Sequence, residues 1–209
     1  FVAEMGGIGI EMPFETSARE IKIQRDRNPL LCPDATASIK MQEKLIQAMQ
    51  EGDTLGGIVG CVATTPPGLG DPIYDKLEAR LAFAMLSIPA TKGFEIGSGF
   101  MGARMKGSQH NDRFIRDPEG NVATATNFSG GVLGGISNGA PLSFRVAFKP
   151  ISSIRQPQET LNIEKESAIL QIPDKGQHDP SALLRAVPVV EAMTALVLVD
   201  ALLMQRLSR

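Results

Sequence analysis

Glycine is concentrated in one short segment of this chain, and that segment constrains the local fold more than any other. It runs Gly130-Gly131-Val132-Leu133-Gly134-Gly135-Ile136-Ser137-Asn138-Gly139. Because glycine has no Cβ, the backbone can turn sharply here and a flat ligand can approach the main chain closely. A strand's length later comes Lys149-Pro150-Ile151-Ser152-Ser153, where a lysine and two hydroxyls can hold an anion. Together the two segments predict a platform for a phosphorylated ligand.

Taken alone, the glycine segment is a weak motif. It matches neither GxxxxGK[ST] nor GxGxxG, and the GxGxxG spacing at Gly97, Gly99 and Gly102 opens no predicted helix. A tight turn between two antiparallel strands would explain the glycines without any ligand. The lysine run shifts the balance, because a charged donor contributes roughly 1.5–3 kcal/mol to holding a phosphate.

Composition excludes several classes of function. The chain has 209 residues, of which 43% are hydrophobic, and a formal charge of −2. Its basic residues form no stripe that could follow a nucleic-acid backbone, so we expect no nucleic-acid partner. Cys32 and Cys61 lack CxxC spacing, and the acidic residues do not cluster as metal ligands would. We therefore expect no metal and a reducing compartment, the cytoplasm.

Hydrophobic spacing predicts the secondary structure. We expect helices over residues 34–50, 75–87 and 186–204, and strands over 2–12, 55–65, 93–96, 100–105, 141–148 and 168–172. Pro89 ends the second helix, residues 66–72 form a rigid loop, and 107–129 form a long polar surface segment. This order favours an α+β layered fold, in one domain over residues 1–209, rather than regular βαβ alternation.

The last predicted helix is apolar on nearly every side. It contains Glu191 and Asp200, and Pro188 lies near its start. These residues favour a buried helix over a membrane span, so no membrane partner is expected. A helix without a polar face should be covered on two sides, for example by a neighbouring subunit.

The two histidines lie in predicted turns. For His110 an ordinary solvated side chain is the simpler interpretation. His178 has the stronger claim to chemistry, because Asp179 adjoins it and its carboxylate could accept or relay a proton. No Ser-His-Asp or Cys-His constellation follows from the spacing, so a hydrolase is not expected.

Short motifs in a fixed order run along the whole chain. They are Cys32-Pro33-Asp34, the segments 52–57, 67–70, 81–87, 92–97, 107–108, 111–112 and 130–139, Lys149-Pro150, His178-Asp179-Pro180, and the segment 185–193. Together they resemble the chorismate synthase family. The resemblance covers essentially all 209 residues, and these correspond to the larger C-terminal part of the family's usual chain.

The resemblance implies a fold and a reaction. The fold would be a β-α-β sandwich, with antiparallel sheets and helices layered between them, in a homotetramer. The reaction would be that of a lyase, which converts 5-enolpyruvylshikimate 3-phosphate to chorismate and phosphate by 1,4-anti elimination. This is the last common step of the shikimate pathway to the aromatic amino acids. The cofactor would be reduced FMN, supplied with electrons either by the enzyme's own use of NADPH or by an outside reductant.

The resemblance also implies a set of site residues. Asp179 would be the carboxylate beside the flavin that manages the proton at N5, with His178 next to it. Gln177 stands where the family usually has Arg, and the loss of one charged contact costs roughly 1.5–3 kcal/mol. The flavin contacts would be Pro89, Ala90, Gly134, Lys149, Pro150, Ile151, Ser152, Ser153 and Gln177.

Three motifs of the family have no counterpart in these residues: a Gly-Glu-Ser-His-Gly type sequence, an Arg-Pro-Gly-His-Ala-Asp type sequence and an Arg-Ser-Ser type segment. In the family they carry two histidines with acid roles and most of the arginines that hold the substrate phosphate. These residues by themselves should therefore fail in catalysis. Two alternatives stay open, a non-catalytic flavin-binding module and an oligomerisation module built on the apolar helix from Pro188 to Met204.

Overall fold

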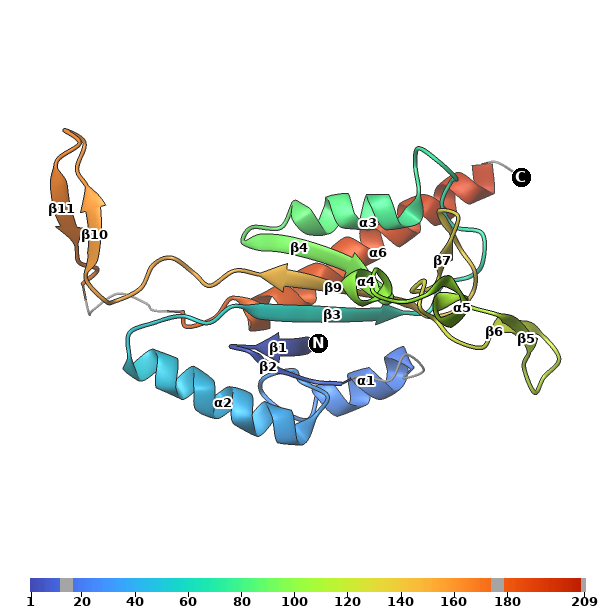
Figure 1. The fold of residues 1–209 in the computed structure, drawn as a ribbon, viewed down its shortest axis with the longest axis horizontal. Helices are drawn as coiled ribbons and strands as arrows, with labels where there is room; N and C mark the ends of the chain where they lie inside the picture. Colours follow the sequence, from blue (N-terminus) through green and yellow to red (C-terminus); the bar gives the residue numbers. More distant parts are fainter. Residues whose placement is uncertain (12–16, 174–178, 208–209) are drawn as a thin grey trace.

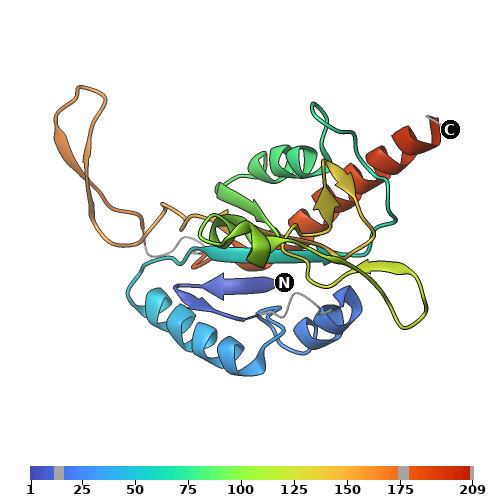
Figure 2. The same cartoon turned by 45° about the vertical axis from the view of Figure 1, so that its right-hand side comes forward.

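An antiparallel five-stranded sheet forms the centre of the molecule, with strand order β2-β1-β3-β9-β4. The computed structural model describes residues 1–11, 17–173 and 179–207. Three helices pack their apolar residues into one core with this sheet (Figures 1 and 2). The sheet strands are β1 (Val2–Met5), β2 (Ile8–Gly9), β3 (Gly57–Ala63), β4 (Thr91–Ile96) and β9 (Leu142–Phe148), and the helices are α2 (Ala35–Gln50), α3 (Leu77–Leu86) and α6 (Leu183–Leu207). The predicted α+β class is confirmed.

Strand β9 pairs with β3 on one side and with β4 on the other. Its side chains alternate between the two faces of the sheet, as the predicted strand over 141–148 requires. Phe144 lies in the helix-covered core, where its ring centroid is 5.4 Å from that of Phe94. Arg145 lies on the other face and forms an ion pair with Glu95.

The predicted helices over 34–50 and 75–87 are present with nearly the expected bounds. Helix α2 begins after Asp34, whose carboxylate accepts a hydrogen bond from the Ala37 N–H at 2.9 Å. It ends before Gly52, whose φ of 68° lies in the left-handed region. Helix α3 ends at Leu86, before Pro89. Both helices therefore stop where the local sequence favours it.

Two of the predicted strands are wrong in detail. The strand predicted over 2–12, with glycines interrupting it, is divided within the described residues 2–11, because Gly6 and Gly7, with φ of 57° and 83°, turn the chain back between β1 and β2. Residues 100–105 form no strand; the short helix α4 (Gly99–Gly102) begins there instead. The Glu95 carboxylate accepts the Phe100 N–H at 3.1 Å, which stabilises this turn.

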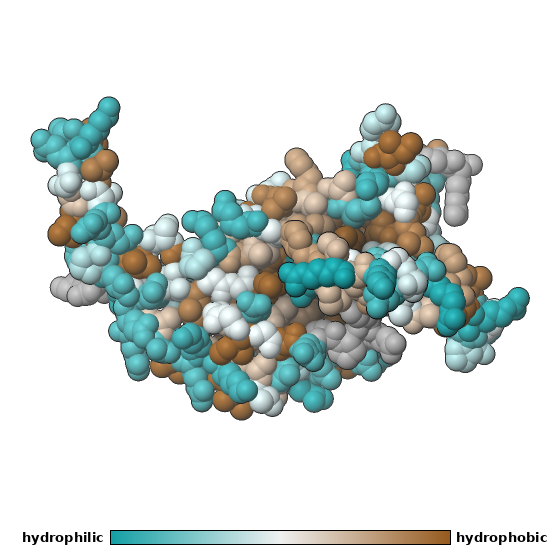
Figure 3. Space-filling view, viewed as in Figure 1, coloured by the Kyte–Doolittle hydropathy of each residue, from teal (hydrophilic) through white to brown (hydrophobic). Residues whose placement is uncertain are grey.

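Hydrophobic spacing did not predict several helices and strands of the structure. Helix α1 (Ala18–Arg25) begins with a capping box, in which Ser17 and Glu20 bond each other's backbone N–H groups. The segment 107–129 holds α5 (Gly107–His110) and the exposed hairpin β5 (Phe114–Arg116) with β6 (Val122–Thr124). The hairpin β10 (Gln158–Leu161) with β11 (Ser167–Leu170), which overlaps the predicted strand 168–172, extends away from the sheet (Figures 1 and 3).

Helix α6 carries a second apolar stripe on its outer side. Leu183, Val187 and Val190 face the core. Exposed apolar residues recur three or four positions apart on the outer side, at Val189, Ala192, Leu196, Val199 and Leu203. Such spacing is typical of a face that packs against another element. By length and composition α6 could also cross a membrane, so the absence of a membrane partner stays a prediction.

Replacing Phe144 tests whether the face of β9 toward the helices holds the core together. Phe144 is 2% exposed and Phe100 is 78% exposed. We expect Phe144→Ala to lower the free energy of unfolding by roughly 3–5 kcal/mol, because it leaves a cavity in the core. Phe100→Ala should change it by less than about 0.5 kcal/mol. Urea unfolding measures both, and equal losses would contradict the described packing.

Candidate functional site

The lysine run lies where β9 ends. The backbone N–H of Lys149 donates to the carbonyl of Ala90 at 2.9 Å, which joins the Pro89-Ala90 turn to the run. Ala90 has a φ of 68°. This left-handed conformation costs a residue with a Cβ roughly 1–2 kcal/mol, and strained residues of this kind cluster at functional sites. The turn and the lysine run therefore form one exposed structure.

A second segment, residues 52–57, forms hydrogen bonds with the lysine run and with Arg155, which follows it. The Thr54 hydroxyl donates to the Ile151 carbonyl at 2.6 Å, and the Arg155 N–H donates to the Gly52 carbonyl at 2.8 Å. A Cβ on Gly56 would lie 2.6 Å from the Phe148 carbonyl oxygen, so glycine is needed for this close approach. The motif at 52–57 was visible in the sequence, but its contact with residues 149–155 was not.

Pro180, which follows Asp179 in the chain, contacts the segment 52–57 from the C-terminal part of the chain. The Leu55 N–H donates to the Pro180 carbonyl at 2.7 Å. The Asp179 carboxylate accepts the Ser181 N–H at 3.3 Å and forms an ion pair with Arg185. His178 and Gln177 lie outside the described residues. We call Pro89, Ala90, Lys149 to Ser153 and Asp179 the Lys149 cluster.

The Lys149 cluster presents unused hydrogen-bond donors. Lys149, Ser152 and Ser153 are exposed. Within residues 1–11, 17–173 and 179–207, the Lys149 ammonium and the two serine hydroxyls have no hydrogen-bond or ion-pair partner. An ammonium and two hydroxyls on one short run can bond a phosphate without breaking existing contacts.

The glycine segment forms a tight hairpin. Strands β7 (Val132–Leu133) and β8 (Ile136–Ser137) pair as Val132 with Ser137 and Leu133 with Ile136. The two residues between them, Gly134 and Gly135, have φ of 61° and 92°. Positive φ at both turn residues is typical of a two-residue hairpin turn. The antiparallel turn considered from the sequence is therefore the conformation of this segment.

The structure does not bring Gly134 near Lys149. A Cβ on Gly131 would touch the carbonyl of Pro141 and the Cα of Leu142, so the hairpin stands where β9 begins. Lys149 follows the end of β9. At about 3.3 Å per residue, the two ends of this strand lie roughly 20 Å apart (Figure 1). A ligand bound at Lys149 reaches Gly134 of the same chain only if it spans the whole strand.

A cavity of about 1050 Å³ adjoins the glycine hairpin. Phe114, Val122 and Phe128 contribute apolar walls, and Asp117 is the charged residue among the described lining. A carboxylate repels a phosphate, so the charges favour the Lys149 cluster as the anion site.

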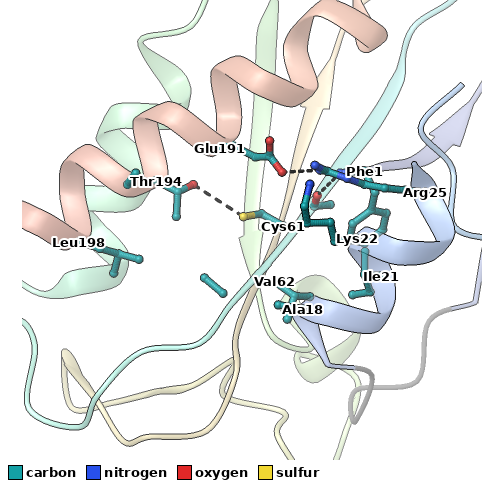
Figure 4. A pocket seen from close by; sticks show the side chains of 13 residues that line it. Phe1, Ala18, Ile21, Lys22, Arg25, Cys61, Val62, Glu191, Thr194 and Leu198 are labelled. Atoms are coloured by element: carbon teal, nitrogen blue, oxygen red, sulfur yellow. Dashed lines mark hydrogen bonds and ion pairs between the residues drawn. The ribbon is translucent and has the colours of Figure 1, made fainter. Parts of the chain in front are cut away.

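A smaller cavity of about 290 Å³ lies between α1, β3 and α6 (Figure 4). Arg25 of α1 forms an ion pair with Glu191 of α6, and the Cys61 Sγ lies 3.7 Å from the Thr194 hydroxyl. Burial raises the pKa of the Cys61 thiol, so it stays protonated and unreactive at neutral pH. Among the described residues, none of those predicted for the site lines this cavity.

Comparisons with known proteins agree on one family. A family model described as chorismate synthase matches residues 1–203. A chorismate synthase of Opitutus terrae is 54% identical over 176 residues, which are 84% of this chain and 48% of that protein. One of Methylacidiphilum infernorum is 52% identical over 208 residues, 99% of this chain and 55% of that protein.

A solved structure described as a crystal structure of chorismate synthase has the same fold. It superposes with a TM-score of 0.79 at 29% identity, over 98% of this chain and 56% of that one. The chain thus spans about half the length of the curated relatives it matches.

Substitutions of two glycines test how closely the hairpin packs against the residues beneath it. A Cβ on Gly130 would lie 2.4 Å from the Gly97 nitrogen, whereas a Cβ on Gly134 would meet nothing within 4 Å. Since both have positive φ, Gly134→Ala should cost about 1–2 kcal/mol of unfolding free energy from backbone strain alone. Gly130→Ala should cost roughly 3–5 kcal/mol, because strain and a backbone clash add. Urea unfolding compares the two variants, and similar costs would refute the close contact with Gly97.

Proposed function

This chain belongs to the chorismate synthase family, and we propose that it forms the flavin-binding part of the family's lyase. In this proposal the whole protein converts 5-enolpyruvylshikimate 3-phosphate to chorismate and phosphate by 1,4-anti elimination with reduced FMN. The proposal rests on the Lys149 cluster, whose exposed donors have no partner among the described residues.

The described residues fit the phosphate of FMN. Lys149, Ser152 and Ser153 would hold it through one charge-assisted bond and two hydroxyl bonds. The backbone of Ala90, fixed by its bond to Lys149, would contact the same ligand. When bound, reduced FMN supplies electron density transiently and undergoes no net oxidation. NADPH is one proposed source of its electrons, and an outside reductant is the other.

Asp179 is the proposed proton carrier in this chain. Its ion pair with Arg185 and its bond from the Ser181 N–H fix the direction of the carboxylate. A carboxylate held in this way can keep a proton at one atom of a neighbouring ring or remove it. His178 and Gln177 would stand beside it, as the family resemblance implies. The groups that hold the substrate phosphate would come from sequence beyond these residues.

We propose the family's further properties for the whole protein as well. These are a homotetramer in the cytoplasm, with residues 1–209 as a single domain, without a metal and without a nucleic-acid or membrane partner. An oligomerisation module is the second candidate function, because the outer stripe of α6 leaves Leu196, Val199 and Leu203 exposed. Under it, this apolar helix would make subunit contacts and the chain would bind no flavin.

The proposal is tested with the full-length protein that contains this chain, under anaerobic conditions with reduced FMN. Lys149→Ala should weaken FMN binding about ten- to a hundredfold, because one charged contact of roughly 1.5–3 kcal/mol is lost. Lys40→Ala is the control, since Lys40 is an exposed lysine on α2. Flavin titration measures the Kd, and phosphate release from the substrate measures turnover.

The outcomes separate the candidate functions. Flavin binding with phosphate release supports the lyase, and flavin binding without release supports the non-catalytic flavin-binding module. Absence of both, with an unchanged oligomer in Lys149→Ala, supports the oligomerisation module and refutes the proposal. Equal FMN affinity of the Lys149 and Lys40 variants would refute the anion site.

A further inference from the structure

Hydrogen bonds from three residues converge on the carboxylate of Asp112, which lies outside the Lys149 cluster. Its Oδ1 accepts the Thr126 hydroxyl at 2.6 Å and the Phe128 N–H at 2.9 Å, and its Oδ2 accepts the Ser129 N–H at 2.8 Å. Asp112 is 8% exposed. Burial alone would raise the pKa of this carboxyl, but the hydrogen bonds from Thr126, Ser129 and Phe128 outweigh burial and lower it.

The residues that Asp112 holds lead directly into the glycine hairpin. Between Phe128 and Thr126, the buried Asn127 side chain accepts the Gly131 N–H and donates to the Pro141 carbonyl, both at 2.8 Å. Asn127 therefore connects the two ends of the hairpin. Its own position depends on neighbours on both sides that bond the same carboxylate.

The hairpin base is also fixed to the sheet. The Ser98 N–H donates to the Phe128 carbonyl at 2.7 Å, and the Ser143 N–H donates to the Gly130 carbonyl at 3.1 Å. His110 hydrogen-bonds the Ser98 hydroxyl at 2.8 Å and its ring centroid lies 5.5 Å from that of Phe128. His110 is thus not the ordinary solvated residue expected from the sequence. It packs against Ser98 and Phe128, which join the base of the hairpin to the end of β4.

A carboxylate is the side-chain group that matches the hydrogen-bond donors around residue 112. The donors from Thr126, Phe128 and Ser129 require acceptors on both oxygens of residue 112. An asparagine has nearly the same shape but offers one oxygen and one NH₂ group, so one donor would face another donor. Leaving a buried donor unsatisfied is costly, and the backbone from 126 to 129 would move to avoid it.

We propose that Asp112 is a positioning residue for the glycine hairpin: its carboxylate sets the path of residues 126–129 and, together with the Leu77 N–H bond to the Gly135 carbonyl, the place at which Gly134 meets a ligand. The ligand role of Gly134 rests on the proposed function, whereas the seating of the hairpin does not. Asp112 acts through the backbone and touches neither Gly134 nor the Lys149 cluster by any hydrogen bond found among the described residues.

The test compares Asp112→Asn with Asp117→Asn in the full-length protein. Asp117 is a matched control, because it accepts hydrogen bonds from Asn121 within the β5–β6 hairpin. Without flavin, Asp112→Asn should speed amide hydrogen exchange at Phe128, Ser129 and Gly131 at least about tenfold, while Asp117→Asn leaves it unchanged. With reduced FMN and substrate, Asp112→Asn should lower kcat about 10- to 100-fold. Its Kd for FMN should stay within about threefold, since the phosphate is held at the distant Lys149 cluster.

Further variants keep the test decisive if Asp112→Asn folds poorly. Thr126→Val removes one donor and keeps the carboxylate, so exchange should rise less than in Asp112→Asn. Asp112→Glu keeps the charge and should restore part of the protection. Unchanged exchange in all three variants, or raised exchange with unchanged kcat, would overturn the positioning role. If the wild-type protein neither binds flavin nor turns over substrate, the proposed function is refuted. The hydrogen-exchange result would still decide whether Asp112 positions the hairpin.

Discussion

Strand β9 pairs with β3 and β4, and this pairing organises both the core and the candidate site. The buried side chains of β9 are those of Leu142, Phe144, Val146 and Phe148, and they fill the core under α3 and α6. A shift of the register by one residue would turn all four out of the core. The strand also carries the glycine hairpin at its start and the Lys149 run at its end. The packing of the core therefore fixes how far apart these two segments lie.

This separation changes what the two segments can do together. From the sequence they form one platform for one phosphorylated ligand, but in the structure a strand of about 20 Å lies between them. Exposed donors gather at the Lys149 end, while apolar walls and Asp117 line the cavity at the other end. In the proposed function, the phosphate of a flavin would therefore bind at Lys149. The hairpin at Gly134 would then meet either a distant part of the ligand or a ligand bound to another chain.

The elements that sequence predicts well are those whose signal is local. The alternation over 141–148 and the helical spacing over 34–50 are periodic patterns, and Asp34 and Gly52 mark the ends of that helix. Helix α1 was missed although Ser17 and Glu20 form a recognisable capping pattern. The strand predicted over residues 100–105 was wrong because Phe100 and Met101 are apolar, as in a buried strand, but are exposed in the structure. The bonds of Thr54 to Ile151 and of Asp112 to Phe128 join distant parts of the chain, and no local pattern announces them.

We propose that the anion of the cofactor binds at the Lys149 end of the sheet. Amide chemical-shift mapping during titration of the full-length protein with reduced FMN tests it most directly. The largest shifts are expected at the backbone amides of Ala90, Lys149, Ser152 and Ser153, with smaller shifts or none at Asp117 and Asn121. Shifts confined to the hairpin around Gly134, with Lys149 and its neighbours unmoved, would contradict it.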